Sequence, residues 1–191
     1  MTDTADHIPA PRSISNVISL ASLPPWRRLF LKAARANVRY TETALHLLDG
    51  PAILTCNHES LLDGLMIAAA SPVPLSFPVN PNFSVNNRLT SRGLAYLQRR
   101  GLGRVIPMSP ESYFSARRLL SELRQGRSVM IFPQGKLAAL GADEPKWMRG
   151  AAWLHEQTGY PILRAEIQGA RRSRFFALAG QELRPRISIT I

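Results

Sequence analysis

Short runs of apolar and β-branched residues alternate with stretches of helical periodicity along most of this sequence. Alternation of this kind is typical of a sheet whose strands are connected by helices. We therefore predict an α/β domain with a mostly parallel central sheet flanked by helices, and active residues on loops at the strand ends. The predicted strands cover residues 51–56, 74–79, 104–108, 128–133, 160–167 and 186–191.

Three of the segments between these strands have a clear helical pattern. They cover residues 61–70, 109–126 and 146–159, and the last two end in Gly126 and Gly159. A glycine just after the last helical turn is a common helix stop, because it adopts the left-handed conformation without steric cost.

A further helix is predicted near the start of the chain, over residues 25–38. Its apolar stripe includes Trp26, Leu29 and Phe30, and basic residues flank that stripe. Such a helix either lies at a membrane interface or packs on the core with a solvated basic rim, and the pattern fits both. Residues 1–24 are rich in Ser, Thr and Pro and are predicted to be a flexible lead-in to one domain over residues 25–191.

The chain is strongly basic, with 24 Lys and Arg against 13 Asp and Glu and a net charge of +11. A charge of this size favours an anionic partner, namely nucleic acid, a membrane surface, a phosphate-bearing substrate or an acidic carrier protein. No helix-turn-helix spacing, zinc-ligand pattern or aromatic-rich RNA motif is present, so no specific nucleic-acid partner is predicted.

Cys56 is the only cysteine of the sequence. It excludes an intramolecular disulfide and a zinc site with several thiolates, and it fits a reducing compartment. Because Cys56 lies inside an apolar run, we interpret it as a buried core thiol and not as a nucleophile. No run of about 18 apolar residues occurs, so the chain is not expected to cross a membrane.

The first candidate for chemistry is the segment TCNHESLLDG, which follows a predicted strand. It places Asp63 five residues after His58, within reach of one helical turn. A carboxylate beside an imidazole fixes its tautomer and stabilises its protonated form, so the pair suits general-base attack on a hydroxyl. Alone, this spacing is also common among surface histidines and helix-capping aspartates.

Two basic segments are candidates for binding a phosphate. In IFPQGK a turn at Gly135 exposes backbone N–H groups beside Lys136, and in QRRGLGRVIP the candidates are Arg99, Arg100 and Arg104. A tight turn with a solvated lysine and a solvated basic loop explain the same patterns, so these alternatives stay open.

Taken in order, four segments resemble the conserved blocks of the glycerophospholipid acyltransferase family. The match is closest to the acyltransferase domain of the bifunctional 2-acylglycerophosphoethanolamine acyltransferase/acyl-carrier-protein synthetase. The resemblance identifies residues 25–191 as an acyltransferase domain. The four segments are NHESLLD at 57–63, RRGLGRVIP at 99–107, FPQGK at 132–136 and YPILRA at 160–165.

This resemblance implies that His58 is the general base, that Asp63 orients it, and that the alkoxide attacks an acyl thioester without a covalent acyl-enzyme. Arg104 and Lys136, with the Gly135 turn, are expected to hold the acceptor phosphate, and Gln134 is assigned to the substrate site. No metal or other cofactor is implied.

The partners implied are a lysophospholipid or glycerol phosphate as acceptor, acyl carrier protein or CoA thioester as donor, and a membrane surface. The implied location is cytoplasmic and peripheral, on the inner face of the cytoplasmic membrane.

The sequence also departs from the family pattern. Gln134 stands where the family has Glu, Arg164 replaces the second Pro of the fourth block, and the second block conforms poorly. Gln keeps the size and hydrogen-bonding reach of Glu but not its charge, so a positioning role survives and a charge-balancing role does not. The alternative is a catalytically weakened, lipid-binding relative of the family.

Overall fold

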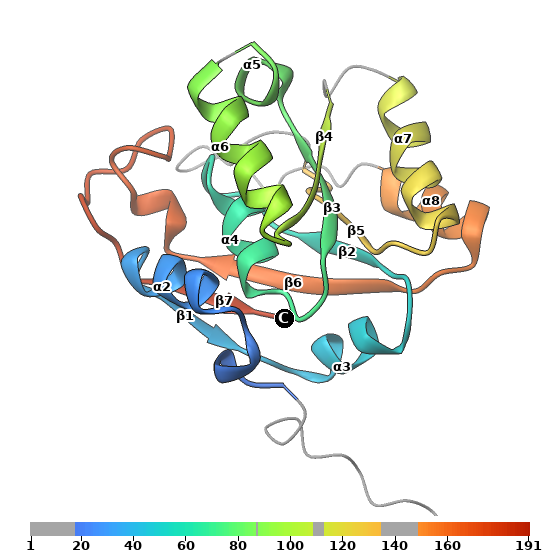
Figure 1. The fold of residues 1–191 in the computed structure, drawn as a ribbon, viewed down its shortest axis with the longest axis horizontal. Coiled ribbons are helices and arrows are strands. Elements are labelled where there is room, and N and C mark those ends of the chain that lie inside the picture. The colour runs from blue at the N-terminus through green and yellow to red at the C-terminus, as the bar shows by residue number, and fades with distance from the viewer. Residues whose placement is uncertain (1–17, 87, 109–112, 135–148) are drawn as a thin grey trace, which may run out of the picture.

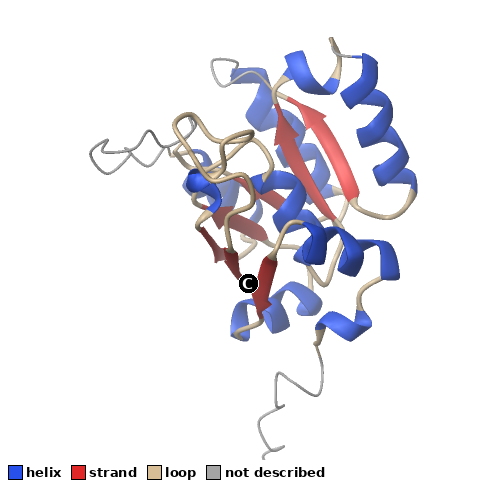
Figure 2. Cartoon of the chain, turned by 90° about the vertical axis from the view of Figure 1, so that its left-hand side faces the viewer, coloured by secondary structure: helices blue, strands red, loops and turns tan. Residues whose placement is uncertain are grey.

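A computed structural model of the chain describes residues 18–86, 88–108, 113–134 and 149–191. In this structure seven strands form one sheet with helices on both faces (Figures 1 and 2). The strands are β1 (Ala36–Arg39), β2 (Ile53–Cys56), β3 (Leu75–Val79), β4 (Gly103–Pro107), β5 (Val129–Ile131), β6 (Ile162–Gln168) and β7 (Ile187–Thr190).

The sheet has the strand order β1-β7-β6-β2-β5-β3-β4. Every neighbouring pair is parallel except β6 and β7, which are antiparallel. This confirms the predicted α/β domain with a mostly parallel sheet, and all six predicted strands are present. The carboxyl ends of β2, β5, β3 and β6 therefore lie at the same end of the sheet, where ligand-binding loops of parallel sheets gather.

The described helices are α2 (Pro25–Ala33), α3 (Glu42–Asp49), α4 (Asp63–Ala70), α5 (Pro81–Ser84), α6 (Arg88–Arg99), α7 (Tyr113–Arg124) and α8 (Gly150–Thr158), with short 3-10 turns η1 (Leu20–Ser22) and η2 (Ala170–Arg172). One core cluster joins α7 and α8 to the sheet through Leu119, Leu123 and Leu154. A larger cluster packs α2, α3 and α4 against the sheet. None of the described helices combines the length and apolar content needed to cross a bilayer.

Helix α4 explains why the sequence after His58 is so apolar. All of its residues except Leu65 are buried, and Asp63 is its first residue. Gly64 allows the close packing of this helix, because a Cβ at that position would lie 3.3 Å from the Phe77 ring. The helix therefore holds Asp63 inside the protein, near the carboxyl end of β2.

The prediction of one helix over residues 25–38 is wrong in its second half. Helix α2 ends at Ala33, Arg35 adopts a positive φ of 53°, and residues from Ala36 form β1 beside β7. Pairing with a strand from the far end of the chain overrides the local helical pattern. Helix α2 itself packs on the core, with Arg27 and Leu31 buried and the basic residues Arg28 and Lys32 exposed.

Part of the predicted lead-in belongs to the folded domain. Ile18 and Leu23 are 4% and 5% exposed and join the larger core cluster. The domain therefore includes residues 18–24, because these two side chains complete its core. Residues 1–17 lie outside the described part of the chain.

Candidate active site

The site begins where β2 leaves the sheet. Asn57 follows the last residue of β2, and its side chain takes the place of a strand residue beside β6. Its Nδ2 donates to the carbonyl of Ile167 at 2.7 Å, and its Oδ1 accepts from the Ile167 N–H at 2.8 Å. This paired bond ends the strand at a fixed point, so the next residue, His58, starts its loop at a defined place.

Asp63 is the best-anchored polar side chain of the site. It has no exposed side-chain surface, and its Oδ2 accepts hydrogen bonds from the backbone N–H groups of Glu59 and Ser60 at 2.5 and 2.7 Å. Its Oδ1 accepts from the Ser60 hydroxyl at 2.6 Å. These donors, together with the amino end of α4, stabilise the negative charge of a buried carboxylate.

His58 contacts the same carboxylate oxygen. Its Nδ1 lies 3.0 Å from Asp63 Oδ2. Because a carboxylate that already accepts other bonds has no proton to give, the proton of this contact belongs to Nδ1. Nε2 is then the free base, and no described residue forms a hydrogen bond with it. The side chain is 19% exposed, so a bound hydroxyl can reach it.

Phe132 stacks its ring on one face of the imidazole. It follows β5, and the two ring centroids are 4.1 Å apart at an interplanar angle of 16°. The imidazole is therefore fixed by a stacked ring on one side and by a carboxylate at its edge. The sequence analysis did not predict Phe132 as a site residue, although it lies directly before the PQGK part of the third block.

Gln134, expected in the substrate site, contacts the His58 loop directly. Its Oε1 accepts a hydrogen bond from the backbone N–H of His58 at 3.0 Å. This bond therefore joins the FPQGK segment to the NHESLLD segment. A Glu side chain would accept the same bond, so the exchange of Glu for Gln keeps this contact and changes only the charge.

Glu59 is a second buried carboxyl group in the loop. It is 9% exposed, and one of its oxygens accepts from the backbone N–H of Arg171 at 3.1 Å. Burial raises the pKa of Glu59, although the bond to Arg171 and the charge of its guanidinium act against this rise. Glu59 thus connects the His58 loop to the segment that follows β6.

Cys56 is confirmed as a core thiol. It is 1% exposed, and burial together with the negative charge of Asp63 raises its pKa far above the ordinary range. A buried thiol that resists ionisation is a poor nucleophile, which disfavours a Cys–His hydrolase.

Arg104 is not brought to His58. It is the second residue of β4 and pairs in register with Ser76 of β3. It therefore lies near the amino ends of the parallel strands, whereas His58 follows the carboxyl end of β2. Ser76 pairs in turn with Val129 of β5, and Val129 pairs with Ile53 of β2, so Arg104 lies level with Ile53 across the sheet. Ile53 is five residues before His58, which is roughly 16 Å along a strand at about 3.3 Å per residue.

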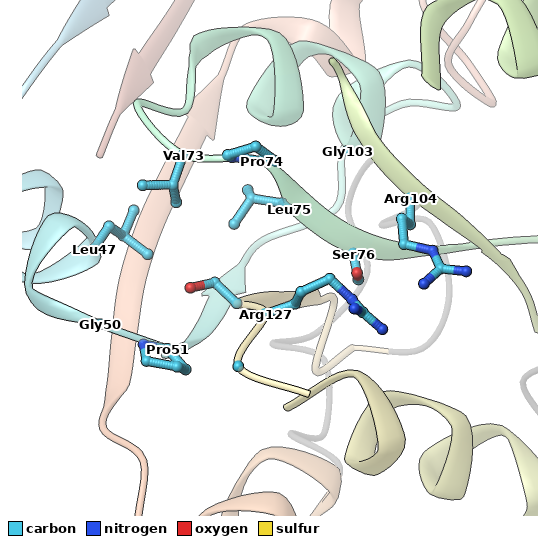
Figure 3. A pocket seen from close by; sticks show the side chains of 12 residues that line it. Leu47, Gly50, Pro51, Val73, Pro74, Leu75, Ser76, Gly103, Arg104 and Arg127 are labelled. Carbon is cyan, nitrogen blue, oxygen red and sulfur yellow. The ribbon is translucent and has the colours of Figure 1, made fainter. Parts of the chain in front are cut away.

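At the amino ends of these strands, Arg104 lines a cavity of about 330 Å³ with Arg127 and Ser76 (Figure 3). Its guanidinium lies 3.5 Å from Glu122. Arg104 therefore has an acidic partner of its own in this structure. Gly135 and Lys136, the other residues expected to hold the acceptor phosphate, lie outside the described residues.

Comparison with known proteins decides the family. The Acyltransferase family model matches residues 35–167, which is more than half of the sequence. The chain belongs to the acyltransferase family. It is also similar in structure to the 1-acyl-sn-glycerophosphate acyltransferase PlsC from Thermotoga maritima, with a TM-score of 0.55 and 17% sequence identity over 86% of this chain and 68% of that chain.

The acyltransferase assignment confirms the enzyme class and fold expected from the sequence. At 17% identity the similarity to PlsC shows a shared fold. Within that fold the structure brings together His58, Asp63 and Gln134. It adds Asn57, Ser60 and Phe132, whose roles depend on bonds and stacking that spacing alone does not reveal.

Proposed function

We propose that this acyltransferase moves a fatty acyl group from an acyl thioester to the hydroxyl of a lysophospholipid or glycerol phosphate. His58 Nε2 takes the proton of the acceptor hydroxyl, and the oxygen attacks the carbonyl carbon of the thioester. The carbon–sulfur bond then breaks, and His58 returns the proton to the leaving thiolate. No metal, other cofactor or acyl-enzyme takes part.

The His58–Asp63 contact carries this proposal. The buried carboxylate and its donors fix the Nδ1–H tautomer, which leaves the lone pair of Nε2 to act as the base. As the reaction proceeds, positive charge develops on the imidazole, and the adjacent carboxylate stabilises that charge. A base prepared in this way is what deprotonation of an alcohol requires.

The chemical nature of the substrates follows from the family and from the charge. A net charge of +11 favours an acceptor with a phosphate and a donor that is acidic, either acyl carrier protein or the phosphate-bearing CoA. Gly135 and Lys136 follow Gln134 directly in the sequence, and Gln134 is bonded to the backbone of His58. We propose these two residues as the phosphate site.

The proposed place of action is the anionic inner surface of the cytoplasmic membrane. Lysophospholipids reside in membranes, and basic residues on helix α2, including Arg28 and Lys32, are exposed. Attachment without insertion of a helix through the bilayer fits the lack of a bilayer-crossing segment among the described helices.

The test is an acyl-transfer assay with a panel of acceptors. Purified protein is mixed with long-chain acyl-CoA or acyl carrier protein thioester and with glycerol 3-phosphate or lysophospholipids of different headgroups. The proposal predicts one acylated lipid per released thiol. Thiol release without a lipid product would show a thioesterase, and neither product with any pair would favour the lipid-binding alternative that Gln134 suggested.

A further inference from the structure

The loop between β6 and β7 exposes four large apolar side chains. The exposed fractions are 64% for Phe175, 41% for Phe176, 65% for Leu178 and 61% for Leu183. Leu61, from the His58 loop, is 50% exposed. We refer to these five residues together as the apolar surface.

The apolar surface adjoins the active site. The backbone N–H of Leu61 donates to the carbonyl of Phe176 at 2.8 Å, and Leu61 is three residues after His58. A second bond between the same two segments joins the Arg171 N–H to Glu59. In Figure 1 this loop projects as the orange and red trace beyond the carboxyl end of β6. Strand β2 runs parallel to β6, so its carboxyl end, followed by His58, lies at the same end of the sheet.

The loop has a defined conformation, so the exposure of these side chains is a fixed property of the fold. Two backbone bonds cross the loop: the Glu182 N–H donates to the Arg172 carbonyl, and the Glu182 carbonyl accepts from the Arg174 N–H, both at 2.8 Å. Gly180 permits the close approach of the two sides, because a Cβ there would lie 2.2 Å from the Ser173 carbonyl oxygen. Apolar groups held in water in this way indicate a contact surface.

The surroundings of the apolar surface are basic. Residues 170–186 contain five arginines and one glutamate. The side chains of Arg171 and Arg172 are 60% and 50% exposed, and Arg184 connects the loop to α2 through a bond to the Ala33 carbonyl. An acidic protein would match the arginines, but exposed Phe and Leu side chains fit the acyl region of a lipid bilayer better.

We infer that the apolar surface docks on an anionic lipid bilayer, with Phe175 and Leu178 entering the acyl region and the arginines meeting lipid phosphates. Docking in this orientation brings His58 to the depth of the headgroups, where the hydroxyl of a membrane-bound acceptor lies. The inference deepens the proposed function and rests on it for the identity of the acceptor.

Vesicle binding tests the inference without requiring chemistry. Wild type is compared with the double variant Phe175→Ser/Leu178→Ser by co-sedimentation with vesicles of phosphatidylcholine and phosphatidylglycerol. We expect the double variant to bind at least about tenfold more weakly, because two apolar side chains no longer enter the bilayer. The matched control is Leu48→Ser, which removes a leucine that is 46% exposed on α3. It should bind like wild type, and equal thermal melting curves show that all variants are folded.

Acyl transfer by the same variants separates this inference from the proposed function. The double variant should lose far more activity on a vesicle-borne lysophospholipid than on water-soluble glycerol 3-phosphate. Unchanged vesicle binding with normal transfer would overturn the inference and leave the function standing. Weakened vesicle binding when no form of the protein transfers an acyl group would support the inference and refute the function. Loss of binding to acyl carrier protein with intact vesicle binding would also overturn the inference.

Discussion

The carboxylate of Asp63 accepts hydrogen bonds from two backbone N–H groups, one hydroxyl and His58, all within 3.0 Å. Asp63→Asn keeps the size of the side chain but replaces one acceptor oxygen with a donor. The amide nitrogen then faces the Ser60 hydroxyl, which accepts its hydrogen bond, and the carbonyl oxygen keeps the bonds from His58 and the two backbone N–H groups. What is lost is the negative charge that stabilises the protonated imidazole during the reaction. We expect kcat to fall about 10²- to 10⁴-fold in the thioester assay.

The control for this variant is Ser60→Ala. It removes one bond to Asp63 Oδ1 and leaves the His58 contact in place. We expect it to lower kcat less than about tenfold, because the lost bond, of about 1.5–3 kcal/mol to a charged group, helps to hold Asp63 but leaves its charge and its contact with His58 in place. Equal effects of the two variants would contradict the role assigned to the Asp63–His58 contact.

Gln134 acts on the catalytic loop through the His58 backbone, at 3.0 Å. Gln134→Ala leaves that N–H without its acceptor and loosens the position of His58, so we expect kcat to fall about tenfold or more. Gln134→Glu restores an acceptor of the same reach and should retain activity much closer to wild type. If both variants lose activity equally, the amide has a role beyond this bond. Initial rates at saturating and limiting acceptor concentrations give the separate effects on kcat and KM.

At the scale of elements, Gly103 sets the spacing of β3 and β4. It has a φ of +121°, and a Cβ there would lie 2.0 Å from the Leu75 carbonyl oxygen. Gly103→Ala should therefore lower the free energy of unfolding by about 3 kcal/mol or more, measured by urea denaturation. The control is Gly93→Ala on α6, which has no atom within 4 Å of its Cβ and should be neutral or stabilising by up to about 1 kcal/mol. Similar losses in both variants would refute the packing argument.

Glu122 on α7 connects this helix to the amino ends of β3 and β4. Burial alone would raise its pKa, but hydrogen bonds from Arg127 and Ser76 and the charge of Arg104 outweigh burial and lower it. A lowered pKa in the folded state means that the ionised Glu122 stabilises the protein above the ordinary Glu pKa of about 4.3, and that this contribution is lost as the pH falls through the lowered value.

Glu122→Gln should therefore reduce the free energy of unfolding by about 1 to 3 kcal/mol at neutral pH, because Arg127 loses its charged acceptor. The difference from wild type should shrink progressively as the pH is lowered into the acid range. Urea denaturation at several pH values measures both quantities. A difference that stays constant with pH would show that the charge of Glu122 does not contribute.

The burial of an element determines how clearly the sequence predicts it. Strands β2 and β5 are buried on both faces and α4 is almost wholly buried, so their apolar runs are evident. Strand β1 was missed because its residues alternate between half-buried and exposed and depend on β7, from the far end of the chain. Helix α6 was also missed: it has no buried residue and a polar average composition, although its apolar residues gather on one side of the helix.

At the scale of the whole molecule, local and distant parts of the site differ in how well they could be predicted. His58 and Asp63 are five residues apart and meet through one loop and the start of α4, so their spacing predicted the contact that the structure shows. The place of Arg104 depends on the register of β3 and β4, which the sequence does not specify. The bond from Gln134 to His58 likewise depends on the neighbouring positions of β2 and β5.

The sheet also separates two basic regions of the molecule. Arg104 and Arg127 lie at the amino ends of the strands and share Glu122, whereas five arginines follow β6, of which Arg171 pairs with Glu59 and Arg172 with Glu182. Both groups therefore contribute ion pairs to the fold, and the second group follows the carboxyl end of β6, where the Arg171 N–H bonds to Glu59 of the His58 loop. Under the proposed docking, this second group faces the anionic surface together with His58.

The central claim is that His58 is the base of an acyl transfer, and one comparison tests it most directly. Thioester-dependent acylation of a lysophospholipid is measured for wild type, His58→Ala and His46→Ala, the last being an exposed histidine on α3. The account predicts that His58→Ala loses at least about 10²-fold in kcat while His46→Ala stays close to wild type. Acyl transfer by His58→Ala at the wild-type rate would contradict it.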